Sequence, residues 1–479
     1  MDTSAYLSGL KYLVPEIYLL AVAAVSMFVH LFVKKRGARR AGYVVLAGLI
    51  AGVAVLFLSP LSPGEIYSGS LSVDSFALYF KAIFLLSGIL TLVLAFRFFG
   101  VEKFEAGEMY YLIPLILIGM TAAVSSVDLI TAYVAFELFA IPSYVLAGIF
   151  KKEQRSAEAG IKYFFLGTLS SGIMLLGMAL VFGLTGETNF AAIGKALAGP
   201  NDHIALIGMI LFFVGLFFKA ALAPFHMWAP DVYEGAPTPL VVFLSTAPKA
   251  AVFAMLIRLV LTVFPKFEVQ WTYIFQIIAL ITMFWGNIAA LGQTNLKRMM
   301  AYSSIAHAGY LAIGLAAWGQ LANTAILFYL VMYLFMNAAA FGLILLVRKS
   351  AGFGEEVADL GGLARSSPLA AGCLLVVLLA LTGIPPTAGF MGKYFIFAAA
   401  VEKGLYWLAA AGALNSVISL FYYFRIGRAI YMEEPRPGIR FEPSVPVLAV
   451  LVAAAAVLLI FGIFPGLLTS IASAATLIK

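Results

Sequence analysis

Apolar stretches of about 20 residues follow one another along almost the whole chain, and single charged residues interrupt several of them. A helix of that length rises 1.5 Å per residue and crosses the ~30 Å hydrocarbon layer of a bilayer. A composition of 63% hydrophobic and 11% charged residues excludes a soluble globular protein. The pattern therefore predicts an all-α polytopic membrane protein.

A sliding window of this length predicts fourteen transmembrane helices. They lie at residues 12–33, 41–58, 74–96, 109–125, 128–149, 160–184, 205–223, 238–262, 271–292, 299–317, 322–347, 368–401, 406–431 and 445–470. The seventh and twelfth stretches each place a lysine beside proline or glycine residues, which interrupt helices. We expect helices 7 and 12 to be broken.

No linker divides the chain, so residues 1–479 are expected to form a single membrane domain. Within it, helices 1–3 occupy residues 1–108, helices 4–8 residues 109–262, helices 9–13 residues 271–431, and the last helix residues 445–470. Two five-helix units that begin at helices 4 and 9 would cross the membrane in opposite directions. This spacing predicts two inverted five-helix repeats whose broken helices meet near the midplane.

Lysine and arginine residues are distributed unevenly between alternate loops. Nineteen lie on the side of the run KKRGARR (34–40), five on the other side and six within predicted spans. Because positive loops face the cytoplasm, both termini are expected outside it. The first residues lack the basic segment and cleavage site of a removable signal peptide, so the first apolar stretch is expected to be a permanent span.

Four charged residues fall at similar depth in separate apolar stretches: Glu137, Lys219, Lys249 and Lys393. Each central charge costs ~2.5–3.5 kcal/mol even on lenient insertion scales, so such residues mark pathways for charge more often than not. Burial disfavours an ionised lysine and a nearby carboxylate favours it, so a lysine under both influences can exchange its proton. The pattern predicts an intramembrane proton path. The alternatives are a static Glu137–Lys219 ion pair and lysines that reach towards an interface.

Histidine offers further candidates. His307 could relay protons because histidine titrates near neutral pH, and it could equally be a packed, hydrogen-bonded residue. His226, Asp231 and Glu234 lie close together in the sequence, but their spacing matches no standard metal motif, and we expect them to line the mouth of a polar cavity. We predict no metal site.

Other polar residues have simpler interpretations. Lys81 and Lys162 lie near predicted helix ends and are expected to be loop charges or to extend to an interface. Asp74 and Asp128 are expected to be helix N-caps. The single cysteine excludes a four-thiolate cluster on this chain alone, and neither an ATP-binding nor a dinucleotide-binding motif is present. The energy for transport is therefore expected from an ion gradient or a partner protein.

Four segments together identify a family. FKAALAPFHMWAPDVYEGAPTP, LSTAPKAAVFAMLIR, NLKRMMAYSSIAHAGY and LTGIPPTAGFMGKYFIF closely resemble the antiporter-like membrane subunits of respiratory complex I. The resemblance runs through predicted helices 4–13. It implies a subunit of a proton-translocating NADH:quinone oxidoreductase, in which this chain provides one proton channel.

The resemblance also assigns residues and partners. The helix 5 glutamate of the family matches Glu137, and its lysines of helices 7, 8 and 12 match Lys219, Lys249 and Lys393. Possible relay positions are His226, His307 and Lys162. The resemblance implies no cofactor on this chain, with NADH, FMN, iron–sulfur clusters and quinone on partner subunits. It further implies a bacterial inner membrane, other membrane-arm subunits as partners, and no nucleic acid.

The sequence leaves two alternative functions open. A sodium/proton antiporter or a membrane-bound hydrogenase would share the same helices without NADH chemistry. In a structural scaffold, the buried ion pairs would only hold helices together.

Overall fold

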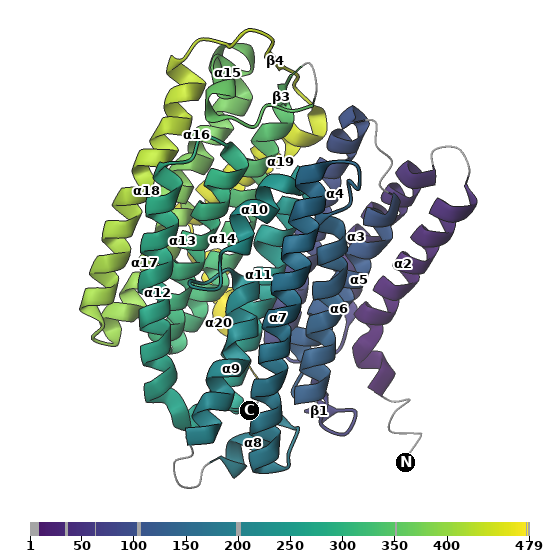
Figure 1. Ribbon diagram of the computed structural model, residues 1–479, viewed down its shortest axis with the longest axis vertical. Coiled ribbons are helices and arrows are strands. Elements are labelled where there is room, and N and C mark those ends of the chain that lie inside the picture. The colour runs from purple at the N-terminus through teal and green to yellow at the C-terminus, as the bar shows by residue number, and fades with distance from the viewer. Residues whose placement is uncertain are drawn as a thin grey trace.

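The computed structural model describes residues 9–33, 37–62, 64–102, 107–197, 203–349, 352–475 and 477. Long helices lie side by side along the vertical axis of Figure 1 and are joined at the two ends of the bundle. Strands within the described residues are two short antiparallel pairs, β1 (Glu65–Ile66) with β2 (Leu71–Ser72) and β3 (Val347–Arg348) with β4 (Arg440–Phe441). The predicted all-α class is confirmed.

The first half of the chain forms three N-terminal helices and a group that ends in the centre of the bundle. The three N-terminal helices are α2 (Val14–Phe32), which a 3-10 turn at Leu10–Leu13 precedes, α3 (Gly37–Leu58) and α4 (Ser75–Glu102). The following helices are α5 (Gly107–Ser125), α6 (Leu129–Ala147), α7 (Gln154–Thr185), α8 (Phe190–Ala196), α9 (His203–Ala220), α10 (Trp228–Gly235) and α11 (Thr238–Thr262).

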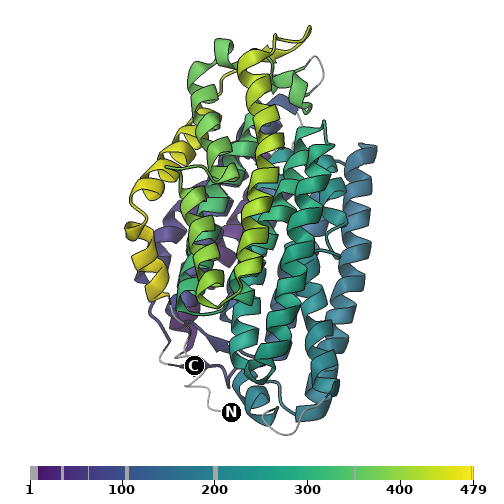
Figure 2. The same cartoon turned by 90° about the vertical axis from the view of Figure 1, so that its left-hand side faces the viewer.

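The second half repeats long helices and short connecting turns. Its helices are α12 (Glu268–Leu291), α13 (Leu296–Ala316), α14 (Gln320–Gly342), α15 (Leu363–Ser366), α16 (Pro368–Thr382), α17 (Ala388–Glu402), α18 (Tyr406–Met432), α19 (Val445–Ile463) and α20 (Gly466–Ala474). Short 3-10 turns lie at Pro265–Phe267, Leu343–Leu346 and Val357–Leu360. Figure 2 shows α18 towards the viewer and the C-terminal helices, in yellow, at one edge of the bundle.

Twelve helices in the described ranges are long and apolar enough to cross a membrane. The two remaining predicted spans correspond to α13 and to the pair α16 and α17. Every predicted stretch thus contains a helix, and the total of fourteen membrane crossings stays a prediction. The positive segment 34–36 and the single lysines Lys103 and Lys479, which entered the prediction of sidedness, lie outside the described residues.

Two helices are interrupted at the predicted places. Helix α9 ends at Ala220 and α10 begins at Trp228, with Pro224 between them. Helix α16 ends at Thr382, and Gly383 follows with a φ of +88°, a left-handed conformation that glycine adopts without strain. Pro224 lacks the N–H that continues a helix, and the left-handed conformation of Gly383 turns the chain away from the axis of α16.

Helices α11, α13 and α14 lie at the centre of the bundle. All residues in the most apolar window of α11 and 94% of those in α14 are buried, whereas only 28% are buried in α2. A helix that is apolar on all sides belongs in the interior of a bundle, where it contacts other helices around its circumference. The position of α11 puts Lys249 at the centre of the protein.

Candidate functional site

The three predicted lysines all lie inside the bundle. Lys219 is in the last turn of α9, Lys249 is in the middle of α11 directly after Pro248, and Lys393 is in the second turn of α17. Their exposed fractions are 1%, 1% and 3%. The alternative that Lys249 or Lys393 extends to an interface is therefore wrong for this structure.

Aromatic rings surround Lys219. Its Nζ lies 4.6 Å from the ring centres of both Tyr144 and Tyr163 and 5.5 Å from that of Phe139, within cation–π distance. Neither Lys219 Nζ nor the buried Oε1 of Glu137 has a hydrogen-bond partner. The two groups form no ion pair within 4.0 Å in the described part of the chain. A static Glu137–Lys219 lock is thus not formed.

Lys249 is bound by one residue of α13. Its Nζ donates hydrogen bonds to the Ser304 carbonyl at 2.8 Å and to the Ser304 Oγ at 2.5 Å. Among the described residues no carboxylate lies within ion-pair distance of it. The ammonium of Lys249 is therefore held by neutral oxygens in the centre of the protein.

The break between α16 and α17 forms the site of Lys393. Its Nζ donates to the carbonyls of Leu381 and Thr382 at 3.0 and 2.9 Å and to Ser416 Oγ at 2.7 Å. The last carbonyls of a helix have no partner within the helix, and the negative end of the helix dipole favours a cation there. Lys393 Nζ also lies 4.6 Å from the ring centre of Tyr310. The interruption therefore supplies the acceptors that make a buried lysine tolerable.

His307 lies close to two of these lysines. Its Nδ1 is 2.6 Å from the Tyr329 hydroxyl and its Nε2 is 3.1 Å from the Tyr423 hydroxyl. On α13, His307 follows Ser304, which binds Lys249, by about one turn. Its ring centre is 5.6 Å from that of Tyr310, which lies beside Lys393. The structure thus brings His307 together with the lysines of α11 and α17.

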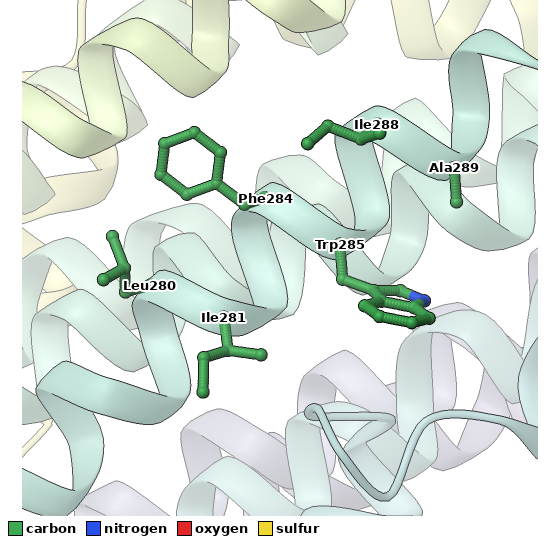
Figure 3. A pocket seen from close by; sticks show the side chains of 6 residues that line it. All are labelled: Leu280, Ile281, Phe284, Trp285, Ile288 and Ala289. Carbon is green, nitrogen blue, oxygen red and sulfur yellow. The ribbon is translucent and has the colours of Figure 1, made fainter.

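His226 lies elsewhere, in the interruption between α9 and α10. It is buried, its Nδ1 has no hydrogen-bond partner, and its ring centre is 5.4 Å from that of Trp285. Figure 3 shows Trp285 on an open apolar groove along α12. The residues that line the groove are Leu280, Ile281, Phe284, Trp285, Ile288 and Ala289.

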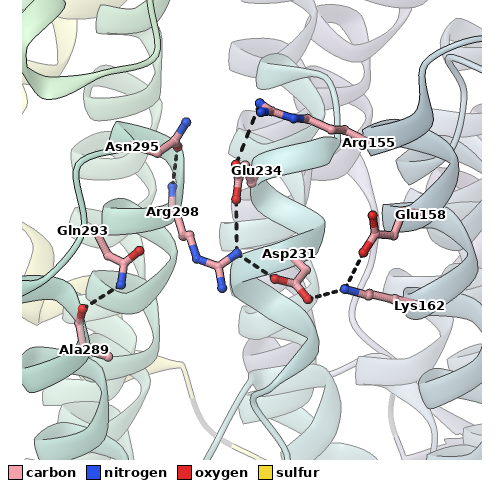
Figure 4. Close-up of polar contacts among 9 residues, drawn as sticks. All are labelled: Arg155, Glu158, Lys162, Asp231, Glu234, Ala289, Gln293, Asn295 and Arg298. Atoms are coloured by element: carbon pink, nitrogen blue, oxygen red, sulfur yellow. Dashed lines mark hydrogen bonds and ion pairs between the residues drawn. The ribbon is translucent and has the colours of Figure 1, made fainter.

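Lys162 belongs to a partly exposed network of ion pairs that joins α7, α10 and α13 (Figure 4). Asp231 accepts from Lys162 and from Arg298, both at 2.7 Å. The further pairs are Lys162–Glu158 at 2.6 Å, Arg298–Glu234 at 3.1 Å and Arg155–Glu234 at 3.8 Å. Asp231 and Glu234, the two acidic residues considered as metal ligands, are thus each paired with cationic side chains. No cluster of three or more His, Cys, Asp or Glu suited to a metal occurs in the ranges described.

Two buried ion pairs were missed by the sequence analysis. Lys81 is 1% exposed and lies 2.7 Å from Glu16 of α2, so its interpretation as a loop or interface charge is wrong. Asp74 caps α4 by accepting from the Ala77 N–H, as predicted, and it also pairs with Arg258 of α11 at 2.9 Å. The sequence did show that these charged residues lie in or beside apolar stretches far apart in the chain. Which of them form pairs depends on which helices pack together.

The polar residues of α18 were missed as well. Ser416 contacts Lys393, and Tyr423 contacts both His307 and Ser303. The sequence spacing of these residues along one helix face was visible, but serine and tyrosine are also common packing residues of membrane helices.

The fold and this site define a polytopic helical membrane protein that keeps a group of ionisable side chains inside its bundle. Residues 126–419 match the family model described as NADH:quinone oxidoreductase/Mrp antiporter, transmembrane. The chain is 41% identical to NADH-quinone oxidoreductase subunit N of Trichlorobacter lovleyi, over 98% of this chain and 97% of the relative. The chain belongs to the subunit N branch of the NADH:quinone oxidoreductase/Mrp antiporter family.

Solved structures agree with this assignment. A chain of respiratory complex I from Thermus thermophilus with bound aureothin superimposes with a TM-score of 0.81 at 33% identity, covering 95% of this chain and 98% of that one. A chain of the Mrp complex from a Dietzia species shares the fold, with a TM-score of 0.83 at 22% identity and 97% of each chain covered. The resemblance inferred from the four sequence segments is confirmed.

Proposed function

We propose that this chain is the antiporter-like, proton-translocating subunit N of a bacterial NADH:quinone oxidoreductase. Glu137, Lys219, Lys249 and Lys393 carry one proton path through it. The observation that supports this most strongly is the burial of three lysine ammonium groups inside one bundle. His307 lies on the helix that binds Lys249 and packs against Tyr310, which lies beside Lys393. Intramembrane ionisable groups of this kind mark ion pathways.

The environments of the three lysines suggest different roles. Lys219 has aromatic rings but no hydrogen-bond acceptor, so a carboxylate that comes close to it would favour its charged form. Lys249 and Lys393 each have oxygen acceptors and can hold a proton without a carboxylate. A charge change in a neighbouring subunit would alter the Glu137–Lys219 interaction, and Lys219 would release its proton towards Lys249 and then Lys393.

The remaining functions belong to other subunits of the complex. NADH oxidation and quinone reduction would take place there, with FMN and iron–sulfur clusters, and this chain would act as a translocase subunit beside further antiporter-like subunits. We further propose a single membrane domain of fourteen spans with inverted repeats at helices 4–8 and 9–13. Both termini would lie outside the cytoplasm of a bacterial inner membrane.

Replacing Lys219 by Ala in the assembled complex tests the path. We expect proton pumping per NADH oxidised to fall because the first proton carrier is missing. Pumping is measured by dye quenching in inside-out vesicles, alongside NADH oxidation, and assembly by native gel. A normally assembled Lys219→Ala complex with unchanged coupling would remove Lys219 from the mechanism.

A further inference from the structure

The imidazole of His307 contacts a phenol at each of its two ring nitrogens. Tyr329 of α14 lies at Nδ1, and Tyr423 of α18 lies at Nε2. The Tyr423 hydroxyl is also 2.5 Å from Ser303 Oγ. All four side chains are at least 99% buried, so they form one continuous hydrogen-bonded row across three helices.

The hydrogen bonds of this row can point in either of two directions. A neutral imidazole carries one N–H donor and one acceptor nitrogen, so one phenol must donate to it while the other accepts from it. With the proton on Nδ1, His307 donates to Tyr329 and accepts from Tyr423. With the proton on Nε2, His307 donates to Tyr423 and accepts from Tyr329.

We propose that Ser303, Tyr423, His307 and Tyr329 form a proton wire, with Tyr423 and Tyr329 as its relay residues; this inference rests on the function proposed above. A proton arrives at the Ser303 oxygen while the Ser303 proton moves to Tyr423. The Tyr423 proton moves to Nε2, the Nδ1 proton moves to Tyr329, and the original Tyr329 proton leaves.

The row gains and loses the same number of protons in this transfer. Each oxygen ends with the single proton it began with, and the imidazole changes from the Nδ1–H to the Nε2–H tautomer. Rotation of the hydroxyl groups and return of the tautomer reset the row. The same steps in reverse carry a proton the other way.

The residues of the row are neighbours in the chain or in space of residues beside the two lysines that the proposed path must join. Ser303 is adjacent in sequence to Ser304, which binds Lys249. At the other end the Tyr329 ring packs against Gly392, where an added Cβ would collide with it, and Gly392 is adjacent to Lys393. The row therefore lies where a proton would pass between α11 and α17.

Removing single hydroxyl groups in the complete complex tests the wire. Tyr423→Phe and Tyr329→Phe keep the rings and delete one link each. The matched control is Tyr79→Phe, because the Tyr79 hydroxyl also donates a hydrogen bond to α14, at the Leu327 carbonyl, but is not part of the row. Since a positioned proton-transfer group contributes about 100-fold or more to a rate, we expect proton pumping to fall about tenfold or more in the two link variants. The control should pump normally.

Links of one wire act in series, which a purely structural role does not reproduce. The double variant Tyr423→Phe/Tyr329→Phe should therefore pump no worse than either single variant, whereas independent packing defects would add. Normal pumping by assembled Tyr423→Phe, additive losses, or an equal loss in Tyr79→Phe would overturn the wire. So would failure of both link variants to assemble when the control assembles.

Lys249→Ala separates this inference from the proposed function. If Lys249→Ala abolishes pumping while Tyr423→Phe pumps normally, the path stands and the wire is wrong. If Lys249→Ala itself pumps normally, the proposed path through the lysines is wrong, and the wire is rejected with it.

Discussion

The ion pair between Asp74 and Arg258 allows the contribution of a buried charge to be measured separately from that of a helix cap. Asp74 accepts from Arg258 Nη2 at 2.9 and 3.2 Å and from the Ala77 N–H at 2.7 Å. Arg258 also donates to the Val124 carbonyl at 3.1 Å, so its guanidinium connects α4, α5 and α11. Asp74→Asn removes the negative charge but keeps an N-cap of nearly equal quality.

The expected loss of stability in Asp74→Asn follows from the burial of both charged groups. The side chain of Arg258 is 2% exposed and that of Asp74 is 0% exposed. At 2.9 Å the attraction between two unit charges is ~6 kcal/mol at an effective dielectric near 20. Most of this attraction offsets the desolvation of the two ions. In Asp74→Asn the guanidinium of Arg258 is still desolvated, but the attraction of the Asp74 carboxylate no longer offsets that cost. We therefore expect a loss of ~3–5 kcal/mol in stability.

The assay is the temperature at which the solubilised complex dissociates, together with the amount of complex assembled in membranes. Asp128→Asn is the matched control, because Asp128 also caps a helix but forms no ion pair within the described residues. It should cost less than ~0.5 kcal/mol. Adding Arg258→Met to Asp74→Asn should restore most of the lost stability. Equal stability of the two Asp→Asn variants, or no recovery in the double variant, would refute this reasoning.

Two further substitutions test other contacts. Gly392→Ala would place a methyl group against the Tyr329 ring, and we expect ~1–3 kcal/mol of destabilisation and weaker proton pumping. Gly372→Ala, which meets no neighbouring atom within 4 Å, is its control, and equal behaviour of the two in thermal dissociation would contradict the packing argument. Glu16→Gln would leave the ammonium of Lys81 buried without its anion and should cost ~3–5 kcal/mol, seen as less assembled complex. Wild-type amounts of Glu16→Gln complex would show that this pair does not hold α2 against α4.

The sequence predicted the class of the protein, the places of its helices and the positions of its buried lysines. These properties depend on local composition, because the hydrocarbon layer sets the length of each span and proline or glycine interrupts helical hydrogen bonding. The breaks beside Lys219 and Lys393 were predicted for this reason, and so was the cap at Asp128. The family could also be identified, because its motifs are short contiguous segments.

The partners of these residues were decided by the tertiary structure alone. Lys393 binds carbonyl groups that are free only because α16 ends beside it, and Arg258 pairs with a carboxylate 184 positions away in the sequence. The assignment of Lys81 failed because nothing in its own span reveals that α2 brings Glu16 to it. Local sequence determines that a segment is helical and apolar. Which face of each helix meets which neighbour depends on the packing of the whole bundle, and that packing decides which charges are paired.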